Sequence, residues 1–140
     1  MTSRRRRGLL WAGILVVWSA LIVMGLILLA AGLWQTGYFE PTGEALARDR
    51  AGRNLVFLGS ITILAAAGAA RWMHTPVWAC ILVATPAILV GGLTLVFYNS
   101  YLPHLSALVT FPIGLAGLIS GLILARPLLR IRTMHPNAND

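Results

Sequence analysis

Four long runs of apolar residues, none containing Asp, Glu, Lys or Arg, make up most of this 140-residue chain. An uncharged apolar stretch of about 18 residues or more indicates a transmembrane helix, because it is long enough to cross the hydrocarbon core of a bilayer. The runs cover residues 9–34, 55–70, 77–98 and 105–125. The sequence therefore predicts an all-α, polytopic integral membrane protein that folds as a four-helix bundle.

The composition excludes both a water-soluble domain and a nucleic-acid-binding domain. Mean hydropathy is +0.79 and only 11% of the residues are charged, whereas soluble domains carry about 25% charged residues. The net charge of +7 comes from arginines that flank the apolar runs, and they lack the interleaved aromatic residues of a nucleic-acid surface. We therefore expect no nucleic acid among the partners.

The run lengths predict one membrane domain over residues 1–140. Its spans lie at about 9–34, 54–72, 77–98 and 104–125, with an outer loop at 35–53 and a cytoplasmic tail at 126–140. The first run is about 39 Å long as a helix and exceeds the apolar core of a signal peptide, so it is predicted to span and to remain uncleaved. The second run is the shortest and needs Asn54 and Trp72 at its ends to cross.

The arginine distribution predicts the orientation. With the N-terminus in the cytoplasm, eight arginines lie inside and three, Arg48, Arg50 and Arg53, lie outside, which agrees with the positive-inside rule. Both termini are thus expected on the cytoplasmic side of the plasma membrane. Membrane lipids are the first expected partners, and the residues predicted to attract anionic lipids are Arg4, Arg5, Arg6, Arg7, Arg126, Arg130 and Arg132. In the turn between the second and third spans, Trp72 and Trp78 are expected at headgroup level.

The second half of the outer loop has the charge spacing of a helix. Glu44 precedes Arg48, and Asp49 precedes Arg53, each by four residues, which is the favourable order for ion pairs on a helix. Pro41 and Thr42 supply a start signal, and Gly43 and Gly52 are weak points. The sequence thus predicts that the second helix extends beyond the membrane.

Two interpretations of this outer segment stay open. It is either a solvated extension of a short span or a docking surface for the outer domain of a partner. In the second case its apolar contacts are predicted to be Tyr38, Phe39 and Leu46.

Small residues gather on several of the predicted spans, and small side chains let helix backbones approach closely. Gly117 and Gly121 form a G-x-x-x-G pair in the fourth span, which serves either packing inside the bundle or dimerisation. The predicted helix-packing residues are Gly114, Gly117, Gly121, Ala66, Ala70, Gly91 and Gly92.

The third and fourth spans each contain a proline near the middle, Pro86 and Pro112. Proline removes a backbone hydrogen bond and kinks a membrane helix, and the hydroxyls of Thr85 and Thr110 are near enough in sequence to compensate. Facing kinks can open a cavity, so these four residues define a possible ligand cavity.

No catalytic, cofactor or metal site is predicted. The apolar runs hold no acid that could serve a nucleophile or base. His74 and His104 fall at opposite ends of the bundle, about 30 Å apart, and His135 follows the last span. Cys80 is the only cysteine and is expected to pack as a small apolar residue.

These observations favour a small non-catalytic protein, an accessory, assembly or scaffolding subunit that works through helix packing with other membrane proteins or with itself. The alternative is a small transporter, channel or lipid-handling protein with a pathway at the kinked third and fourth helices or at an oligomer interface. That alternative gains if one polar lining is formed by Thr85, Thr94, Ser106, Thr110 and Ser120.

Overall fold

The computed structural model describes residues 3–36, 42–97 and 100–134, together with the side chains of 9–36, 42–97 and 100–124. These residues form helices only, and four rods are long and apolar enough to cross a membrane. The predicted four-helix membrane bundle is confirmed, and the protein is a multi-pass membrane protein. The helices are α1 (Ser3–Gln35), α2 (Gly43–Trp72), α3 (Val77–Pro86), the π-helix η1 (Ala87–Gly91), α4 (Gly92–Val96) and α5 (Leu102–Met134).

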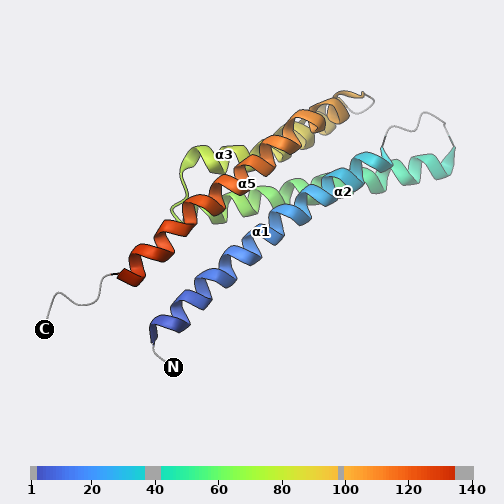
Figure 1. The fold of residues 1–140 in the computed structure, drawn as a ribbon. Helices are drawn as coiled ribbons and strands as arrows, with labels where there is room; N and C mark the ends of the chain where they lie inside the picture. The colour runs from blue at the N-terminus through green and yellow to red at the C-terminus, as the bar shows by residue number, and fades with distance from the viewer. Residues whose placement is uncertain (1–2, 37–41, 98–99, 135–140) are drawn as a thin grey trace, which may run out of the picture.

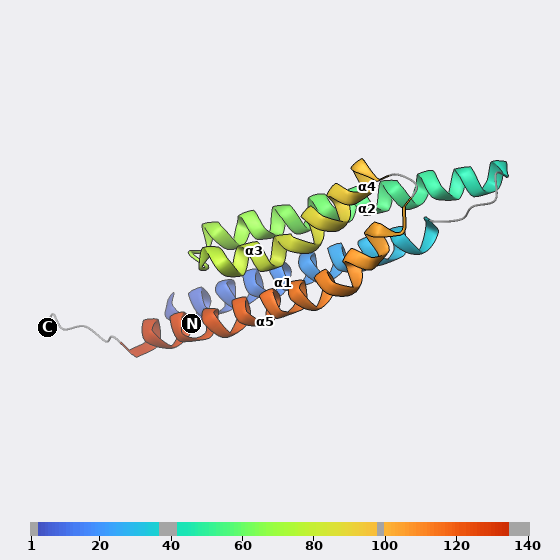
Figure 2. The same ribbon diagram turned by 90° about the horizontal axis from the view of Figure 1, so that it is seen from above.

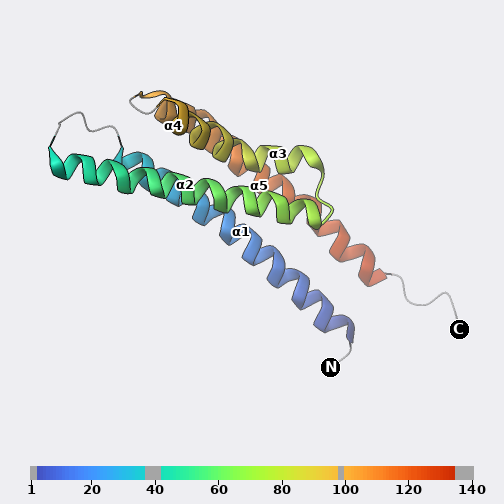
Figure 3. The same cartoon turned by 180° about the vertical axis from the view of Figure 1, so that it is seen from behind.

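Successive rods run in opposite directions along one axis (Figures 1 and 2). The start of α1, the α2–α3 turn and the end of α5 share one end of the bundle, and α4 finishes near the start of α5 at the other end. Seen from behind, α2 lies across α1, and the first turns of α1 leave the bundle (Figure 3). Accordingly, nearly all the side chains of residues 9–17 are exposed.

The first part of α2, residues 43–54, precedes its apolar run, and we call it the outer part after its predicted location. It begins where the sequence predicts. Thr42 caps the helix, and its hydroxyl accepts a hydrogen bond from Ala45 N at 3.3 Å. Asp49 and Arg53 form the expected ion pair at 3.4 Å. The helix then continues unbroken to Trp72, so the second span does extend beyond its apolar run, as Figure 2 also shows.

The last helix continues beyond its apolar part. We predicted a membrane span at 104–125 and a tail from residue 126; the apolar part of α5 is Leu102–Leu124, and the helix continues to Met134, so the first residues of the tail are helical. The added segment is rich in Leu and Arg, which are good helix formers and extend a helix beyond its apolar part.

The two mid-span prolines have different effects on their helices. After Pro86 the third rod widens into the π-helix η1 before α geometry resumes at Gly92. The helix up to Pro86 keeps α geometry, so the wide turn lies after the proline and not over the carbonyl four residues before it, which the ring crowds. Around Pro112, in contrast, α5 keeps one helix type throughout.

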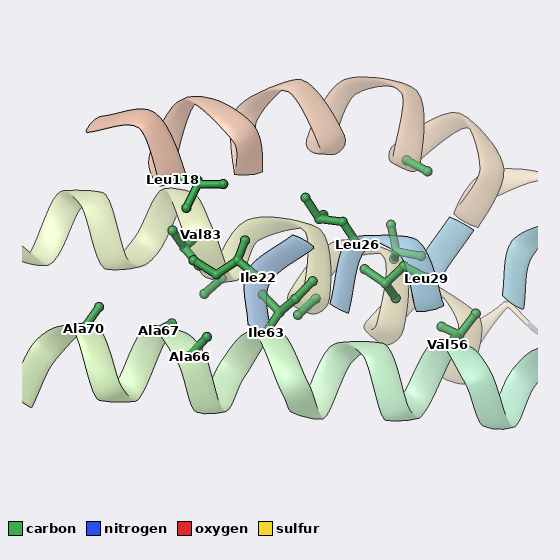
Figure 4. Close-up of a cluster of buried hydrophobic side chains, with 14 of the residues drawn as sticks. Ile22, Leu26, Leu29, Val56, Ile63, Ala66, Ala67, Ala70, Val83 and Leu118 are labelled. Carbon is green, nitrogen blue, oxygen red and sulfur yellow. The ribbon is translucent and has the colours of Figure 1, made fainter. Parts of the chain in front are cut away.

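The core is formed by aliphatic side chains from all four rods (Figure 4). Ile22 and Leu29 of α1 meet Val56 and Ile63 of α2, all at most 1% exposed. On the other side, Val83 and Leu118 bring in α3 and α5. Among the described side chains, the buried polar residues are Ser60, Thr94 and Thr110, and none is charged.

Candidate functional site

Helices α1 and α2 approach each other closely at positions where their glycines face each other. A Cβ atom on Gly59 would lie 2.8 Å from Gly25 O, and one on Gly52 would lie 2.7 Å from Gly32 O. In the reverse direction, a Cβ atom on Gly25 would lie 3.2 Å from Gly59 O, and one on Gly32 would lie 2.6 Å from Gly52 O. Because these distances leave no room for a side chain, backbone packs directly on backbone. We call these four glycines the α1–α2 interface.

The spacing of these glycines explains their pairing. Gly25 and Gly32 are seven residues apart, as are Gly52 and Gly59. A seven-residue repeat places its members on one face of a helix, and two antiparallel helices with this repeat meet along that face. Trp18 and Ala66 continue the two repeats by a further seven residues, towards the end of the bundle where both termini lie.

Trp18 connects three helices. It is only 4% exposed, and its Nε1 donates a hydrogen bond to Ala66 O at 2.9 Å. Ala66, fully buried, leaves space for the indole ring. On α5, a Cβ atom on Gly121 would lie 2.7 Å from Trp18 Cη2, so the ring also packs on the glycine face of α5.

The sequence reasoning missed the α1–α2 interface and treated Gly52 as a weak point of the outer helix. In the structure Gly52 is a buried contact with α1. The available signal was the seven-residue spacing of glycines, at 25 and 32 in the first helix and at 52 and 59 in the second. It was hidden because glycine is abundant, with 14 in the chain.

The predicted glycine face of α5 packs against α3, and we call this contact the α3–α5 interface. A Cβ atom on Gly117 would lie 2.8 Å from Val83 N, and one on Gly114 would lie 2.7 Å from Pro86 Cγ. The remaining predicted packing residues divide into two groups. Ala66, Ala70 and Gly91 are buried in helix contacts, and a Cβ atom on Gly91 would lie 2.5 Å from Ser60 Oγ. Gly92 is not in such a contact, because a Cβ atom there would meet nothing within 4 Å.

The four residues of the possible cavity lie on different faces. Pro86 and Thr110 are buried, whereas Pro112 is exposed and Thr85 is partly exposed. Thr85 donates to Ile81 O in its own helix at 2.8 Å. The two prolines therefore do not face each other, and Pro86 instead packs against Gly114.

The proposed polar lining is mostly engaged within single helices. Thr94 donates to Val90 O at 2.7 Å and Ser106 donates to Pro103 O at 2.8 Å. The buried hydroxyls of Ser60 and Thr110 have no hydrogen-bond partner among the described residues. Ser60 faces Gly91 at the end of η1, so an unpaired hydroxyl lies beside the widened turn.

The histidines lie at opposite ends, as expected. His104, in the first turn of α5, donates through Nε2 to Leu33 O near the end of α1 at 2.9 Å. His74 lies in the α2–α3 turn, and His135 lies outside the described residues. In the part of the chain that the structure describes, no group of three His, Cys, Asp or Glu side chains could hold a metal ion.

The predicted outer contacts are described only in part. Leu46 is 53% exposed on the outer part of α2, and Tyr38 and Phe39 lie outside the described residues. The side chains of the predicted lipid-binding arginines at both ends of the chain are likewise not described, although their backbones belong to α1 and α5.

The described interior thus contains two close helix interfaces, the indole ring of Trp18 between three helices, and two hydroxyls without a hydrogen-bond partner. It contains no buried charged side chain among the described residues. Comparison with known proteins adds nothing to this description, since no family model, curated protein or solved structure matches the chain.

Proposed function

We propose that this chain is an accessory, assembly or scaffolding subunit of the plasma membrane, without catalytic activity, that works by packing a membrane helix against another membrane protein or a second copy of itself. The observation that carries this proposal is the exit of α1 from the bundle. Over residues 9–17 the helix exposes apolar side chains on nearly all sides, including Leu10 (61%), Val16 (68%) and Val17 (61%).

Contacts with α2 and α5 fix the second half of α1, so that its first half can project from the bundle. Its second half is fixed to α2 by the α1–α2 interface, and Trp18 anchors it to α5 just where it leaves the bundle. A helical arm with exposed apolar side chains, on a close-packed base, is a suitable contact for a neighbouring transmembrane helix, because packing rather than charge drives association within lipid. Leu46, on the outer part of α2, is the second proposed contact.

The proposed orientation places both termini in the cytoplasm. Eight arginines then lie on the inner side and three on the outer side, in agreement with the positive-inside rule. The outer part of α2 would then project from the external face.

Site-specific photo-crosslinking tests the proposal. A photoreactive phenylalanine derivative is placed at Val16, at Leu46, or at the control position Leu108 on α5, which is 75% exposed. We expect ultraviolet light on native membranes to give one discrete adduct from Val16 and none from Leu108. The adduct's mass distinguishes a second copy from another protein. Diffuse lipid adducts of the same kind from Val16 and Leu108, with no protein adduct from Leu46, would contradict the proposal.

A transporter, channel or lipid-handling protein is the second candidate. It is favoured by the unpaired hydroxyls of Ser60 and Thr110 and by the π-helix, since π turns occur frequently at functional sites. Purified protein in liposomes would show solute flux in this case. Loss of that flux on combining Pro86→Ala with Pro112→Ala would assign the pathway to the third and fourth rods.

A further inference from the structure

An open pocket of about 610 Å³ lies where α2 ends and turns into α3, lined by Gly68, Arg71, Trp72 and His74. We call it the corner pocket. Its position is at the boundary of the bilayer, because the span of α2 ends at Trp72 and the next span starts at Val77. Trp72 is 90% exposed there, which is how an interfacial tryptophan lies among lipid headgroups.

The charge of the corner pocket is uncompensated within the described chain. Arg71 is exposed and makes no ion pair among the described residues. The described acids, Glu44 and Asp49, belong to the opposite end of α2, and Asp49 is about 33 Å from Arg71 at 1.5 Å per residue. A guanidinium in this setting favours an anionic ligand with phosphate oxygens, which it can bind through two parallel hydrogen bonds.

His74 occupies the pocket at a conformational cost. Its φ is 62°, the one positive value among the described non-glycine residues. The turn holds it there through bonds from His74 N to Arg71 O and from Thr75 N to Ala70 O, both 3.1 Å. Glycine is the usual residue at this left-handed position after a helix. A strained residue that persists at such a position is a reason to look for a function of its side chain.

Gly68 opens the pocket towards the membrane interior. It lies one turn before Arg71 on an exposed face of α2, and a Cβ atom there would meet nothing within 4 Å. The pocket is therefore continuous with the lipid-facing surface of α2. A ligand with a phosphate at the boundary and an apolar part directed inward fits this arrangement.

We propose that the corner pocket binds one anionic phospholipid, with Arg71 and His74 donating hydrogen bonds to its phosphate, Trp72 packing on the headgroup and Gly68 admitting the glycerol and the upper acyl chain. An anionic headgroup without an ammonium group is favoured because the described pocket offers no carboxylate to such a cation. This proposal is independent of the function proposed above.

Native mass spectrometry of the full chain in detergent, titrated with phosphatidylglycerol or phosphatidylcholine, tests the proposal. We expect the wild type to retain one phosphatidylglycerol and to bind it at least fivefold more tightly than phosphatidylcholine. Arg71→Gln should weaken phosphatidylglycerol binding about fivefold or more, as expected for one arginine near a lipid surface. The matched control Arg50→Gln removes the same charge from the exposed outer part of α2 and should leave binding unchanged.

His74→Gly separates a ligand role from a structural one. Since glycine relieves the strain at φ 62°, this variant should raise the melting temperature while weakening phosphatidylglycerol binding. A raised melting temperature with unchanged lipid binding would show that His74 does not contact the lipid. Equal effects of Arg71→Gln and Arg50→Gln on phosphatidylglycerol binding would contradict binding in the corner pocket. Inorganic phosphate in lipid-free detergent identifies the source: binding as tight as that of the lipid would make the ligand a soluble phosphate and overturn the lipid assignment.

Discussion

Gly59 and Gly68 lie nine residues apart on the same helix and have opposite surroundings. A side chain on Gly59 would run into backbone atoms of α1, and one on Gly68 would project into open space. Backbone atoms cannot move aside as the end of a flexible side chain can, so the first glycine is required by packing and the second is not. The residue type alone does not tell these two roles apart.

Gly59→Ala should therefore destabilise the protein by about 1–3 kcal/mol, the usual range for overpacking a well-packed interface. The added methyl would meet Gly25 O at 2.8 Å and Leu29 N at 2.9 Å. The matched control is Gly13→Ala on α1, whose methyl would meet nothing within 4 Å. Thermal unfolding of both variants in one detergent, followed by circular dichroism, measures the difference. Equal melting temperatures would show that α1 and α2 are not in close contact at Gly59.

Trp18→Phe should lower the free energy of unfolding by about 0.6–1.5 kcal/mol through loss of the Nε1–H donor, and further because the smaller ring loses the contact of Cη2 with Gly121. The lost bond is the 2.9 Å contact with Ala66 O. Trp34→Phe is the control, because Trp34 is 82% exposed. Chemical denaturation of each variant provides the comparison, and a Trp18→Phe protein as stable as the control variant would argue against this bond.

At the scale of the helices, the sequence predicted which segments span the membrane but not which faces meet. Span positions follow from uncharged length, and the start of α2 at Thr42 followed from its cap and charge spacing. Faces are harder to predict, because a membrane helix is apolar on the side that meets lipid as well as on the side that meets protein. Pro86 and Pro112 were therefore treated alike, although only Pro86 is buried against a neighbouring helix.

The contact between Pro86 and Gly114 predicts a coupled pair of substitutions. Gly114→Ala alone should cost about 1–3 kcal/mol, because its methyl would lie 2.7 Å from Pro86 Cγ. In a Pro86→Ala background the ring is gone, so the same substitution should cost at least about 1 kcal/mol less. A double-mutant cycle on unfolding free energies measures this coupling.

Gly117→Ala is the control for that cycle. Its methyl would meet Val83 N and backbone and Cβ atoms of Leu82, which Pro86→Ala does not remove. Its cost should be the same in both backgrounds. If Gly114→Ala and Gly117→Ala respond identically to the loss of Pro86, the proline ring is not what fills the space opposite Gly114.

At the scale of the whole molecule, the topology relates the corner pocket to the orientation of the termini. With four spans the two termini share one side, and the α2–α3 turn with its corner pocket lies at the same end of the bundle. The proposed orientation, which follows from the positive-inside rule, puts this end in the cytoplasm. The corner pocket would then face the leaflet that is rich in anionic lipids.

Thiol labelling can test this assignment, because Cys80 is the only cysteine in the chain. In a Cys80→Ser background, Ala47→Cys places a thiol on the exposed outer part of α2, and Thr75→Cys places one in the α2–α3 turn. A membrane-impermeant maleimide added to intact cells should label Ala47→Cys but not Thr75→Cys. Permeabilised cells should give labelling of both. Labelling of Thr75→Cys alone in intact cells would invert the topology, and the corner pocket would then lie in the leaflet where an anionic ligand is scarce.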